Sequence, residues 1–360
     1  MRISFCFPAH NYNKPLGGYK VVYEYANRLT MLGHKVNIIY SIENSLKRYK
    51  LPETFRVLVA KIIVKNSPKW FELDSRVERI SVKCIADEFI PESDIIFATA
   101  VETAEPVSRL STLKGKKCYI IQDFENWVYD DDKVINTYKL GFHNITISKW
   151  LNQLLKEHGV DSTYIRNAID LSIFRSLSNF KERNKYSIGF LYHKSEKKGS
   201  KYIIDGLMRV KKKYPNLEVH TFGVPKRPKE MPEWFHYTSK ATIEEVVKIY
   251  NKCSIFVCAT IEEGFGLTGL ESMACGCAFV SSNYSAVYEY AKQDENAILY
   301  PIKDSEIMVK SINRLIENDS LRWKIAENGI RTAQEFSWNN SIEQMEKFLL
   351  EIELGDKREE

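Results

Sequence analysis

Short apolar runs alternate with amphipathic segments from the first residues of the chain onward. The stretches "RISFCF" at residues 2–7 and "KVNIIY" at residues 35–40 are continuous apolar runs of the kind that forms buried strands. Between them, apolar residues recur at helical spacing up to Leu29, and Gly33 follows as a helix-ending residue. Strand, Gly-rich turn, helix and strand in this order predict a βαβ unit and therefore a parallel sheet.

The same alternation is repeated twice along the chain, with a break in the middle. Further strands are predicted at residues 94–99, 117–122, 144–148, 186–192, 217–223, 254–260 and 277–282, and helices are predicted to begin near residues 149, 199, 242 and 268. The polar segment 171–185 lacks periodicity, so we predict that it links two domains. The expected fold is α/β, with two Rossmann-like domains whose parallel sheets face a central cleft. Ligands of such sheets bind beyond the carboxyl ends of the strands.

Length, charge and cysteine content narrow the class of protein. The chain has 360 residues and a formal net charge of +5, which permits an anionic partner but does not indicate a nucleic-acid binder. Its seven cysteines form no CxxC pair, and no charged-then-apolar leader precedes the first predicted strand. We therefore expect a reduced, cytoplasmic enzyme in which Cys275 and Cys277 pack in the core rather than bind a metal. No apolar run reaches the ~18 residues that span a bilayer.

The stretch "EEGFGLTGLESMACGC" at residues 262–277 carries the main candidate chemistry. Glu263 and Glu271 are eight positions apart, and Gly264 and Gly266 let the backbone turn sharply between them. This loop follows a predicted buried strand and leads into the helix that begins near Thr268. The stretch therefore lies where a ligand of a parallel sheet is expected.

A helix start at this place suits a diphosphate, because its free N–H groups and its dipole favour an anion. Glu271, one turn into the helix, accepts hydrogen bonds from two hydroxyls at once, as on a ribose diol. Glu263, before the turn, would face whatever lies beyond the phosphates. The alternative is that both residues are surface acids near a helix start, where acids are mildly favoured.

The segment "EEGFGLTGLESMACGCAFVSS" closely resembles the Glu–x₇–Glu motif of family-4 glycosyltransferases, which have the GT-B fold. Other segments resemble that family in the same order along nearly the whole chain: "PLGGYKVVYEYANRLTMLGHKV", "DIIFATAVETAEPV", "ITISKWL", "YIRNAID", Lys198-Gly199 and "EFSWNNSIEQMEKFL". The resemblance implies an N-terminal acceptor-binding domain at residues 1–170 and a nucleotide-sugar-binding domain at residues 171–335. Residues 336–360 would form a helix that crosses back to the first domain.

The resemblance also implies a retaining transfer of a sugar from a nucleotide donor, without a metal or another cofactor. Glu271 would hold the donor ribose, Glu263 would contact the sugar near its anomeric end, and Lys198 would neutralise the diphosphate. The backbone N–H groups of Phe265, Gly266, Leu267 and Thr268 would bind the sugar hydroxyls and the distal phosphate. The other donor-binding residues would be Gly264, Lys194, Gly17, Gly18 and Tyr237. For the two glycines at residues 17–18 a plain helix start, and for Tyr237 core packing, remain the alternatives.

Three positions depart from the family pattern, and one of them is Thr268, at a helix start often held by Pro. The Arg that usually precedes the Lys is absent, and Lys194 supplies charge without the bidentate fork of Arg. The family's His-Asp pair appears as Gln122-Asp123, and Gln122 cannot carry a proton. We expect Gln122, Asp123 and Glu125 to bind the acceptor, because their loop follows the carboxyl end of a strand. The alternative is a loop of solvated acids. The stretch "QDFENW" is similar to that of bacterial surface-polysaccharide transferases.

A basic segment at residues 45–70 holds seven Lys and Arg residues against Glu53 alone. Its apolar residues follow helical spacing: Phe55, Leu58, Val59, Ile62 and Ile63. Such a segment can rest on an anionic membrane surface, which would suit a lipid-linked acceptor and a peripheral location at the inner face of the membrane. The alternative is an element packed on the core of the first domain.

The sequence therefore predicts a glycosyltransferase that moves a sugar from a nucleotide-sugar donor to a glycan or lipid-linked saccharide in cell-surface polysaccharide synthesis. A non-catalytic nucleotide-sugar-binding or accessory subunit of the same fold is the alternative, because the usual Arg and His are missing. Motif spacing does not identify the sugar, because a few hydrogen bonds determine donor choice. It does not identify the acceptor either, because the acceptor would bind to the first domain, where the motifs are weakest.

Overall fold

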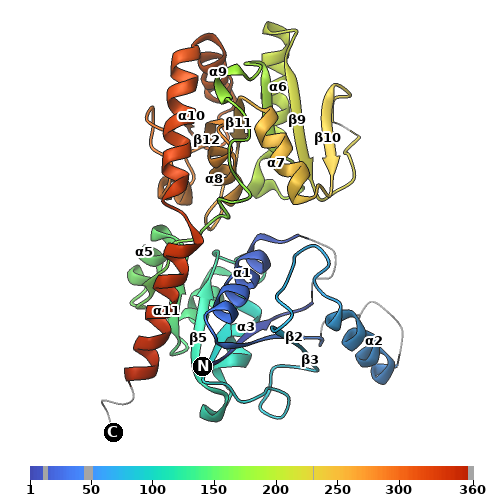
Figure 1. The fold of residues 1–360 in the computed structure, drawn as a ribbon, viewed down its shortest axis with the longest axis vertical. Helices are drawn as coiled ribbons and strands as arrows, with labels where there is room; N and C mark the ends of the chain where they lie inside the picture. Colours follow the sequence, from blue (N-terminus) through green and yellow to red (C-terminus); the bar gives the residue numbers. More distant parts are fainter. Residues whose placement is uncertain (11–14, 44–51, 230, 356–360) are drawn as a thin grey trace. The chain divides into compact units, whose positions relative to one another are not determined.

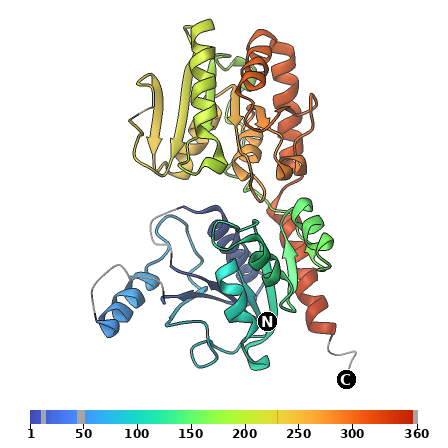
Figure 2. The ribbon, with the colours of Figure 1, turned by 180° about the vertical axis from the view of Figure 1, so that it is seen from behind.

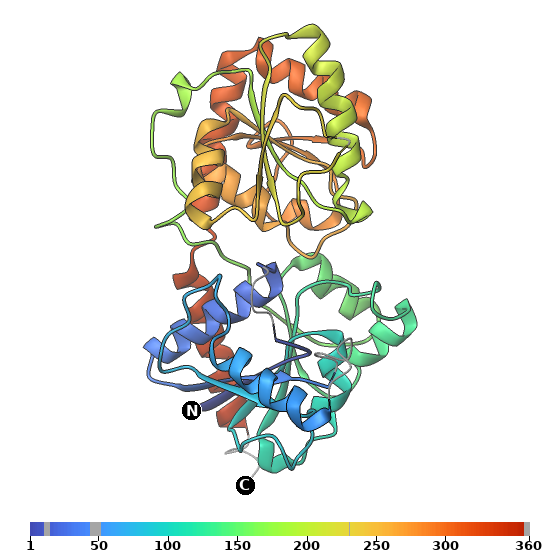
Figure 3. The ribbon, with the colours of Figure 1, turned by 90° about the vertical axis from the view of Figure 1, so that its right-hand side faces the viewer.

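The computed structural model describes residues 1–10, 15–43, 52–229 and 231–355. It divides into two compact units: Met1–Asn167 with Asn339–Glu360, and Ala168–Trp338. Each unit is built on one parallel sheet with packed helices, as the ribbon views show (Figures 1, 2 and 3). Among the described residues, no helix has both the length and the apolar character needed to cross a bilayer.

Unit 1 contains a seven-stranded sheet in the order β3-β2-β1-β4-β5-β6-β7, in which every pair is parallel. Its strands are β1 (Arg2–Phe7), β2 (Lys35–Ser41), β3 (Glu78–Val82), β4 (Ile95–Ala98), β5 (Lys116–Ile121), β6 (His143–Thr146) and β7 (Thr163–Tyr164). Its helices are α1 (Gly17–Met31), α2 (Glu53–Lys65), α3 (Val101–Ser108), α4 (Asp131–Tyr138), α5 (Lys149–Glu157) and α11 (Trp338–Gly355).

Unit 2 contains a six-stranded sheet in the order β10-β9-β8-β11-β12-β13, again with every pair parallel. Its strands are β8 (Ser187–Leu191), β9 (Glu218–Gly223), β10 (Phe235–Ser239), β11 (Ile255–Cys258), β12 (Ala278–Ser282) and β13 (Ala297–Tyr300). Its helices are α6 (Ser200–Lys213), α7 (Ile243–Lys252), α8 (Leu267–Ala274), α9 (Ser305–Glu317) and α10 (Asp319–Gln334). The predicted α/β class with two parallel sheets is confirmed.

The strands lie where continuous apolar runs occur because both faces of a parallel sheet are covered. All residues of β4, β11 and β12 are buried, and β11 and β12 align Phe256 with Phe279. In each unit the strand order reverses at a central strand: β1 lies between β2 and β4, and β8 lies between β9 and β11. A ligand is expected beyond the carboxyl ends of the strands at such a reversal.

The last helix, α11, belongs to unit 1 although unit 2 precedes it in the chain. Ser341 Oγ donates to the carbonyl oxygen of Arg166 at 2.6 Å, and Glu346 pairs with His34 at the end of α1. Met345 and Leu349 are fully buried on the inner face of the helix. The chain therefore closes unit 1 with its own C-terminal helix.

The segment 171–185, predicted as a linker, is part of unit 2. Arg183 explains why a polar segment without periodicity is ordered here. Its guanidinium donates to the carbonyl oxygens of Tyr250, Cys253 and Cys275 and to the side chains of Ser176 and Asn251. The segment is thus held by these hydrogen bonds together with the buried ring of Phe174, and neither contact produces a periodic apolar pattern.

Candidate functional site

The loops that follow β8 and β11 lie side by side at the carboxyl ends of these strands. The Ile261 N–H donates to the carbonyl oxygen of Lys197 at 2.7 Å, and Lys197 Nζ donates to Glu262 Oε1 at 2.9 Å. Gly199 adopts φ +63°, and a Cβ there would lie 1.9 Å from the carbonyl oxygen of Ala259. Only glycine combines that backbone conformation with so close an approach.

This contact brings together the two residues predicted to be catalytic. Lys198 and Glu263 form an ion pair, and their side chains are 26% and 21% exposed. Both line a small cavity of about 10 Å³, together with Thr268 and residues from the ends of β8 and β11. Burial and the neighbouring Lys198 lower the pKa of His193, so His193 is neutral around pH 7. The charge of the cavity therefore comes from the ammonium and the carboxylate.

The turn before α8 is seated on two buried tyrosines. Gly266 adopts φ +93°, and a Cβ there would lie 2.0 Å from the hydroxyl of Tyr284. Tyr290 Oη donates to the carbonyl oxygen of Gly266 at 2.8 Å and lies 3.1 Å from Tyr284 Oη. Gly266 is the N-cap of α8 and has no side chain with which to cap the helix. The helix starts at Leu267, one residue earlier than predicted, and Thr268 lies in its first turn, beside the small cavity.

Glu271 lies one turn into α8 and is only 7% exposed. Tyr250, at the end of α7, donates from its hydroxyl to Glu271 Oε2 at 3.2 Å. Burial, with Glu271 beside it, raises the pKa of Tyr250 well above its ordinary value, so the hydroxyl remains a donor. Tyr250 is a site residue that the sequence analysis missed. No motif marks it, because α7 meets α8 only in the folded structure.

The other predicted donor residues occupy different places. Phe265 is buried against Tyr290 and Phe336, so its side chain belongs to the core of unit 2. Lys194 is exposed in the loop after β8. Tyr237 donates from its hydroxyl to the carbonyl oxygen of Pro225 at 2.6 Å, and its ring packs edge-on against Tyr192.

Gly264 lies buried in the loop between β11 and α8, next to Glu263. Gly17 and Gly18 lie in unit 1, where they begin α1. The structure thus gathers the predicted residues from Lys198 to Glu271 in unit 2 and holds the two glycines in the other unit.

A second polar cluster lies at the carboxyl ends of β1, β4 and β5 in unit 1. A Cβ on Gly18 would lie 3.3 Å from Gln122 Nε2, which is also 3.4 Å from the carbonyl oxygen of Thr99. Tyr19 donates from its hydroxyl to the carbonyl oxygen of Ala9 at 2.7 Å. Gln122 therefore lies against the start of α1, where the strand order of unit 1 reverses.

Glu125 belongs to the same cluster and holds the start of α3. Its Oε2 accepts from the Val101 N–H at 2.6 Å. Burial raises the pKa of Glu125 to about 8; the bond to Val101 opposes this rise, and the nearby Glu102 and Asp123 add to it. Glu125 is therefore largely protonated at neutral pH, whereas the sequence analysis treated it as an ordinary loop acid.

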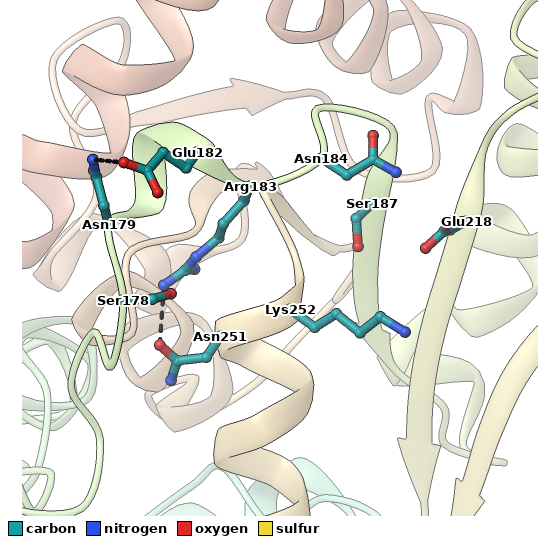
Figure 4. Close-up of a pocket in the computed structure, with 9 residues that line it drawn as sticks. All are labelled: Ser178, Asn179, Glu182, Arg183, Asn184, Ser187, Glu218, Asn251 and Lys252. Atoms are coloured by element: carbon teal, nitrogen blue, oxygen red, sulfur yellow. Dashed lines mark hydrogen bonds between the residues drawn. The ribbon is translucent and has the colours of Figure 1, made fainter.

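The larger cavity of unit 2, of about 310 Å³, lies at the opposite edge of its sheet, near the first residues of β8 and β9. Figure 4 shows its lining: Ser178, Asn179, Glu182, Arg183, Asn184, Ser187, Glu218, Asn251 and Lys252. Arg183 and Asn251 bond to each other here at 3.0 Å and hold the segment 171–185. None of the predicted site residues lines this cavity, and the carboxyl edge remains the candidate site.

Comparisons with known proteins match the second unit. Residues 175–332 match the family model described as Glycosyl transferases group 1. The O-antigen chain mannosyltransferase B of Escherichia coli is 31% identical over 111 residues, which are 31% of this chain and 29% of that protein. An uncharacterized glycosyltransferase of Methanocaldococcus jannaschii is 27% identical over 113 residues, 31% of this chain and 32% of that protein. The chain thus spans about a third of the length of these relatives.

Another relative is a Campylobacter jejuni N,N'-diacetylbacillosaminyl-diphospho-undecaprenol alpha-1,3-N-acetylgalactosaminyltransferase. It is 28% identical over 95 residues, which are 26% of this chain and 25% of that protein.

Solved structures extend the likeness to nearly the whole chain. The sucrose-phosphate synthase of Thermosynechococcus elongatus superposes with a TM-score of 0.76 at 13% identity, over 98% of this chain and 99% of that one. The Anabaena HepE protein in complex with UDP-glucose superposes with a TM-score of 0.73 at 15% identity, over 97% and 99%. Both sheets and their strand orders therefore belong to the two-domain GT-B fold.

Proposed function

We propose that this chain, whose second unit is a group 1 glycosyltransferase domain in a GT-B fold, is a retaining glycosyltransferase that uses a nucleotide-sugar donor. The observation that carries the proposal is the ion pair of Lys198 and Glu263 beside the start of α8, within the residues that match the family model. An ammonium group and a helix start meet at the carboxyl ends of β8 and β11, where a diphosphate is favoured.

Each residue around this cavity would bind a different part of the donor. The diphosphate lies against the first turn of α8, and Lys198 turns from Glu263 to the phosphate as negative charge builds on the leaving group. Glu263 then faces the sugar near its anomeric carbon. Glu271, held by Tyr250, accepts from the ribose hydroxyls. The positive charge at the diphosphate comes from Lys198 and the helix start, so the proposed reaction needs no metal.

The proposed retention of anomeric configuration is supported by the resemblance of the Glu263–Glu271 segment to the motif of a retaining glycosyltransferase family. The acceptor hydroxyl attacks the anomeric carbon from the face that the diphosphate leaves, and the leaving phosphate oxygen takes its proton. The new glycosidic bond and the broken sugar–phosphate bond are on the same face. No enzymic carboxylate forms a covalent intermediate in this scheme, unlike in a retaining glycosidase.

The proposed acceptor is a saccharide, free or lipid-linked, in surface-polysaccharide synthesis. Support comes from relatives whose names describe O-antigen chain and diphospho-undecaprenol substrates. A second observation is the outer face of α2, in the predicted basic segment. Ala60 and Val64 of this helix are buried, whereas Phe55, Leu58 and Ile62 are 52%, 55% and 58% exposed.

The exposed apolar residues of α2 support a contact with an anionic membrane surface. Phe55, Leu58 and Ile62 follow i, i+3, i+7 spacing and share one side of the helix, and Lys61 and Lys65 are exposed next to them. The inner face of α2 packs on β3 at the margin of unit 1 (Figure 1). The structure confirms the packed face of α2, and the membrane contact of its exposed face is part of the proposal. Lys47, Arg48 and Lys50 of the same segment lie outside the described residues.

The donor site is tested by thermal stabilisation with UDP-, GDP-, dTDP- and ADP-linked sugars, followed by assays of nucleotide diphosphate release with saccharide acceptors. A donor at about 100 times its dissociation constant adds about 2.7 kcal/mol to the free energy of unfolding. We expect one nucleotide class to stabilise the protein, and Lys198→Ala to weaken this effect and to lower the transfer rate at least hundredfold. Lys201→Ala is the matched control, because Lys201 is an exposed lysine three positions further on.

The outcomes separate the proposed function from its alternative. Release of nucleotide diphosphate only with donor and acceptor together supports the transferase. Donor binding without turnover for any acceptor favours a non-catalytic or accessory subunit. The absence of stabilisation by every donor contradicts the donor site itself.

A further inference from the structure

The loop that leaves β5 exposes a tryptophan beside the predicted acceptor residues. The Trp127 side chain is 56% exposed, although a large aromatic side chain is normally buried for most of its surface. It lies two positions after Glu125 and five after Gln122, at the carboxyl edge of the unit 1 sheet. Exposed aromatic residues on loops beside a strand edge are a common feature of binding surfaces.

The loop around Trp127 has a fixed backbone. Asp123 Oδ1 accepts from the Phe124 N–H at 2.9 Å, the Asn126 N–H donates to the Phe124 carbonyl at 2.8 Å, and the Val128 N–H donates to the Glu125 carbonyl at 3.0 Å. Glu125 ties the loop to the start of α3 through its carboxyl group. The indole is therefore presented by an ordered turn.

The charges of this loop favour a neutral ligand over an anionic one. Residues 122–132 contain no Lys or Arg, and besides the largely protonated Glu125 they contain four acids: Asp123, Asp130, Asp131 and Asp132. Such a surface repels a phosphate. A pyranose ring is neutral, has an apolar face of C–H groups, and carries hydroxyls around its rim. An indole plane covers that face, while carboxyl and amide oxygens accept from the hydroxyls.

We propose that Trp127 is the stacking platform of an acceptor subsite for a neutral pyranose, with Gln122 and Asp123 bonding to its hydroxyls. This inference rests on the proposed function and narrows it, because the acceptor end that reaches unit 1 is then a sugar ring and not a lipid phosphate. The basic face of α2, rather than this loop, is left to contact phosphates.

The test measures binding to the full chain by saturation-transfer NMR, without any donor. The probes are octyl glycosides of glucose, galactose, mannose, rhamnose and N-acetylglucosamine, with octyl phosphate as the anionic arm. We expect at least one glycoside to bind, Trp127→Ala to weaken that binding about tenfold, and Trp127→Phe to retain it within about threefold, because Phe keeps an aromatic face for the sugar ring and Ala does not. Leu113→Ala is the control, since Leu113 is 70% exposed elsewhere in unit 1.

Three results would overturn the subsite: no glycoside binds, Trp127→Ala and Leu113→Ala bind equally well, or octyl phosphate competes with the glycoside at the same loop. In the transfer assay, Trp127→Ala should raise the acceptor KM about tenfold and leave donor binding unchanged. Failure of the proposed function has a different signature. It leaves Trp127-dependent glycoside binding intact while every nucleotide sugar fails to stabilise the protein.

Discussion

Gly266 shows how strongly one residue determines the candidate donor site. Its φ of +93° is costly for any residue with a Cβ, and the space that a Cβ would need is taken by the hydroxyls of Tyr284 and Tyr290. Gly33 has almost the same φ, +94°, and nothing lies within 4 Å of the place a Cβ would occupy. A comparison of Gly266 with Gly33 therefore separates the cost of backbone strain from the cost of a steric clash.

Gly33→Ala should lower the free energy of unfolding by about 1 kcal/mol, from backbone strain alone. Gly266→Ala should lower it by roughly 3 kcal/mol, because the tyrosine pair must also move. Urea denaturation of both variants measures the two changes. Equal losses would mean that the tyrosines yield easily and do not seat the turn before α8.

The raised pKa of Glu125 makes the free energy of unfolding depend on pH and determines the direction of this dependence. Between its ordinary value of 4.5 and about 8, the folded chain holds a proton that the unfolded chain has lost. The stabilising contribution of this group is therefore complete at acidic pH and is lost as the pH rises through about 8. Because Glu125 is partly exposed, we expect the free energy of unfolding to fall by only about 2 kcal/mol.

Glu125→Gln should remove this dependence, because the amide remains neutral. Relative to the parent chain, the variant should gain stability as the pH rises from 5 to 9, as measured by urea unfolding at several pH values. Glu157→Gln, at an exposed carboxyl of unit 1, is the control. If the free energies of unfolding of Glu125→Gln and of the parent differ by the same amount at all pH values, Glu125 does not hold a proton in the folded chain.

At the scale of the element, α2 has one face packed on unit 1 and one exposed face. Ala60 and Val64 are buried, whereas Phe55, Leu58 and Ile62 are more than half exposed and add little to the core of unit 1. Replacing Leu58 and Ile62 together by Ser should therefore leave the melting temperature nearly unchanged while weakening binding to vesicles that contain an anionic lipid. We expect a loss of at least tenfold from the two apolar side chains.

The electrostatic part of this contact has its own signature. Lys61→Glu should weaken binding to anionic vesicles about fivefold or more and should not alter binding to neutral ones, because each basic residue near such a surface contributes about 1 kcal/mol. Added salt should reduce the difference. Co-sedimentation measures both effects, with Leu113→Ser as the control on another exposed apolar residue. Equal binding of all variants would leave α2 without a membrane role.

The elements also show what a sequence can and cannot predict. Buried central strands such as β11 were predictable because both faces demand apolar residues. The edge strands β3 and β10 escaped prediction, since their partly exposed residues mix polar and apolar types, and the short edge strands β7 and β13 were also missed. Glu263 and Glu271 stood out in a linear motif. The pairing of Lys198 with Glu263 and of Tyr250 with Glu271 depends on loops and helices that meet only in the fold.

At the scale of the whole molecule, the contacts described above for the candidate donor site join residues of unit 2 to one another. Lys197 and Glu262, Tyr250 and Glu271, and Tyr290 and Gly266 pair without any residue of unit 1. The first and last residues of unit 2 are also held together, because Ile169 and Ser337, one residue inside each end, form a β-bridge. Its sheet and helices enclose a core of their own.

A fragment of residues 168–338 should therefore fold cooperatively and bind the donor with a dissociation constant within about tenfold of that of the full chain. It should transfer no sugar, because Gln122, Asp123 and Trp127 are absent from it. Calorimetric titration with the stabilising nucleotide sugar measures the affinity, and Lys198→Ala in the fragment is the control for the site. A folded fragment that does not bind the donor would show that residues of unit 1, such as Gly17 and Gly18, complete the site. Retained affinity would place the whole of donor recognition in unit 2 and leave these glycines the role of starting α1 against Gln122.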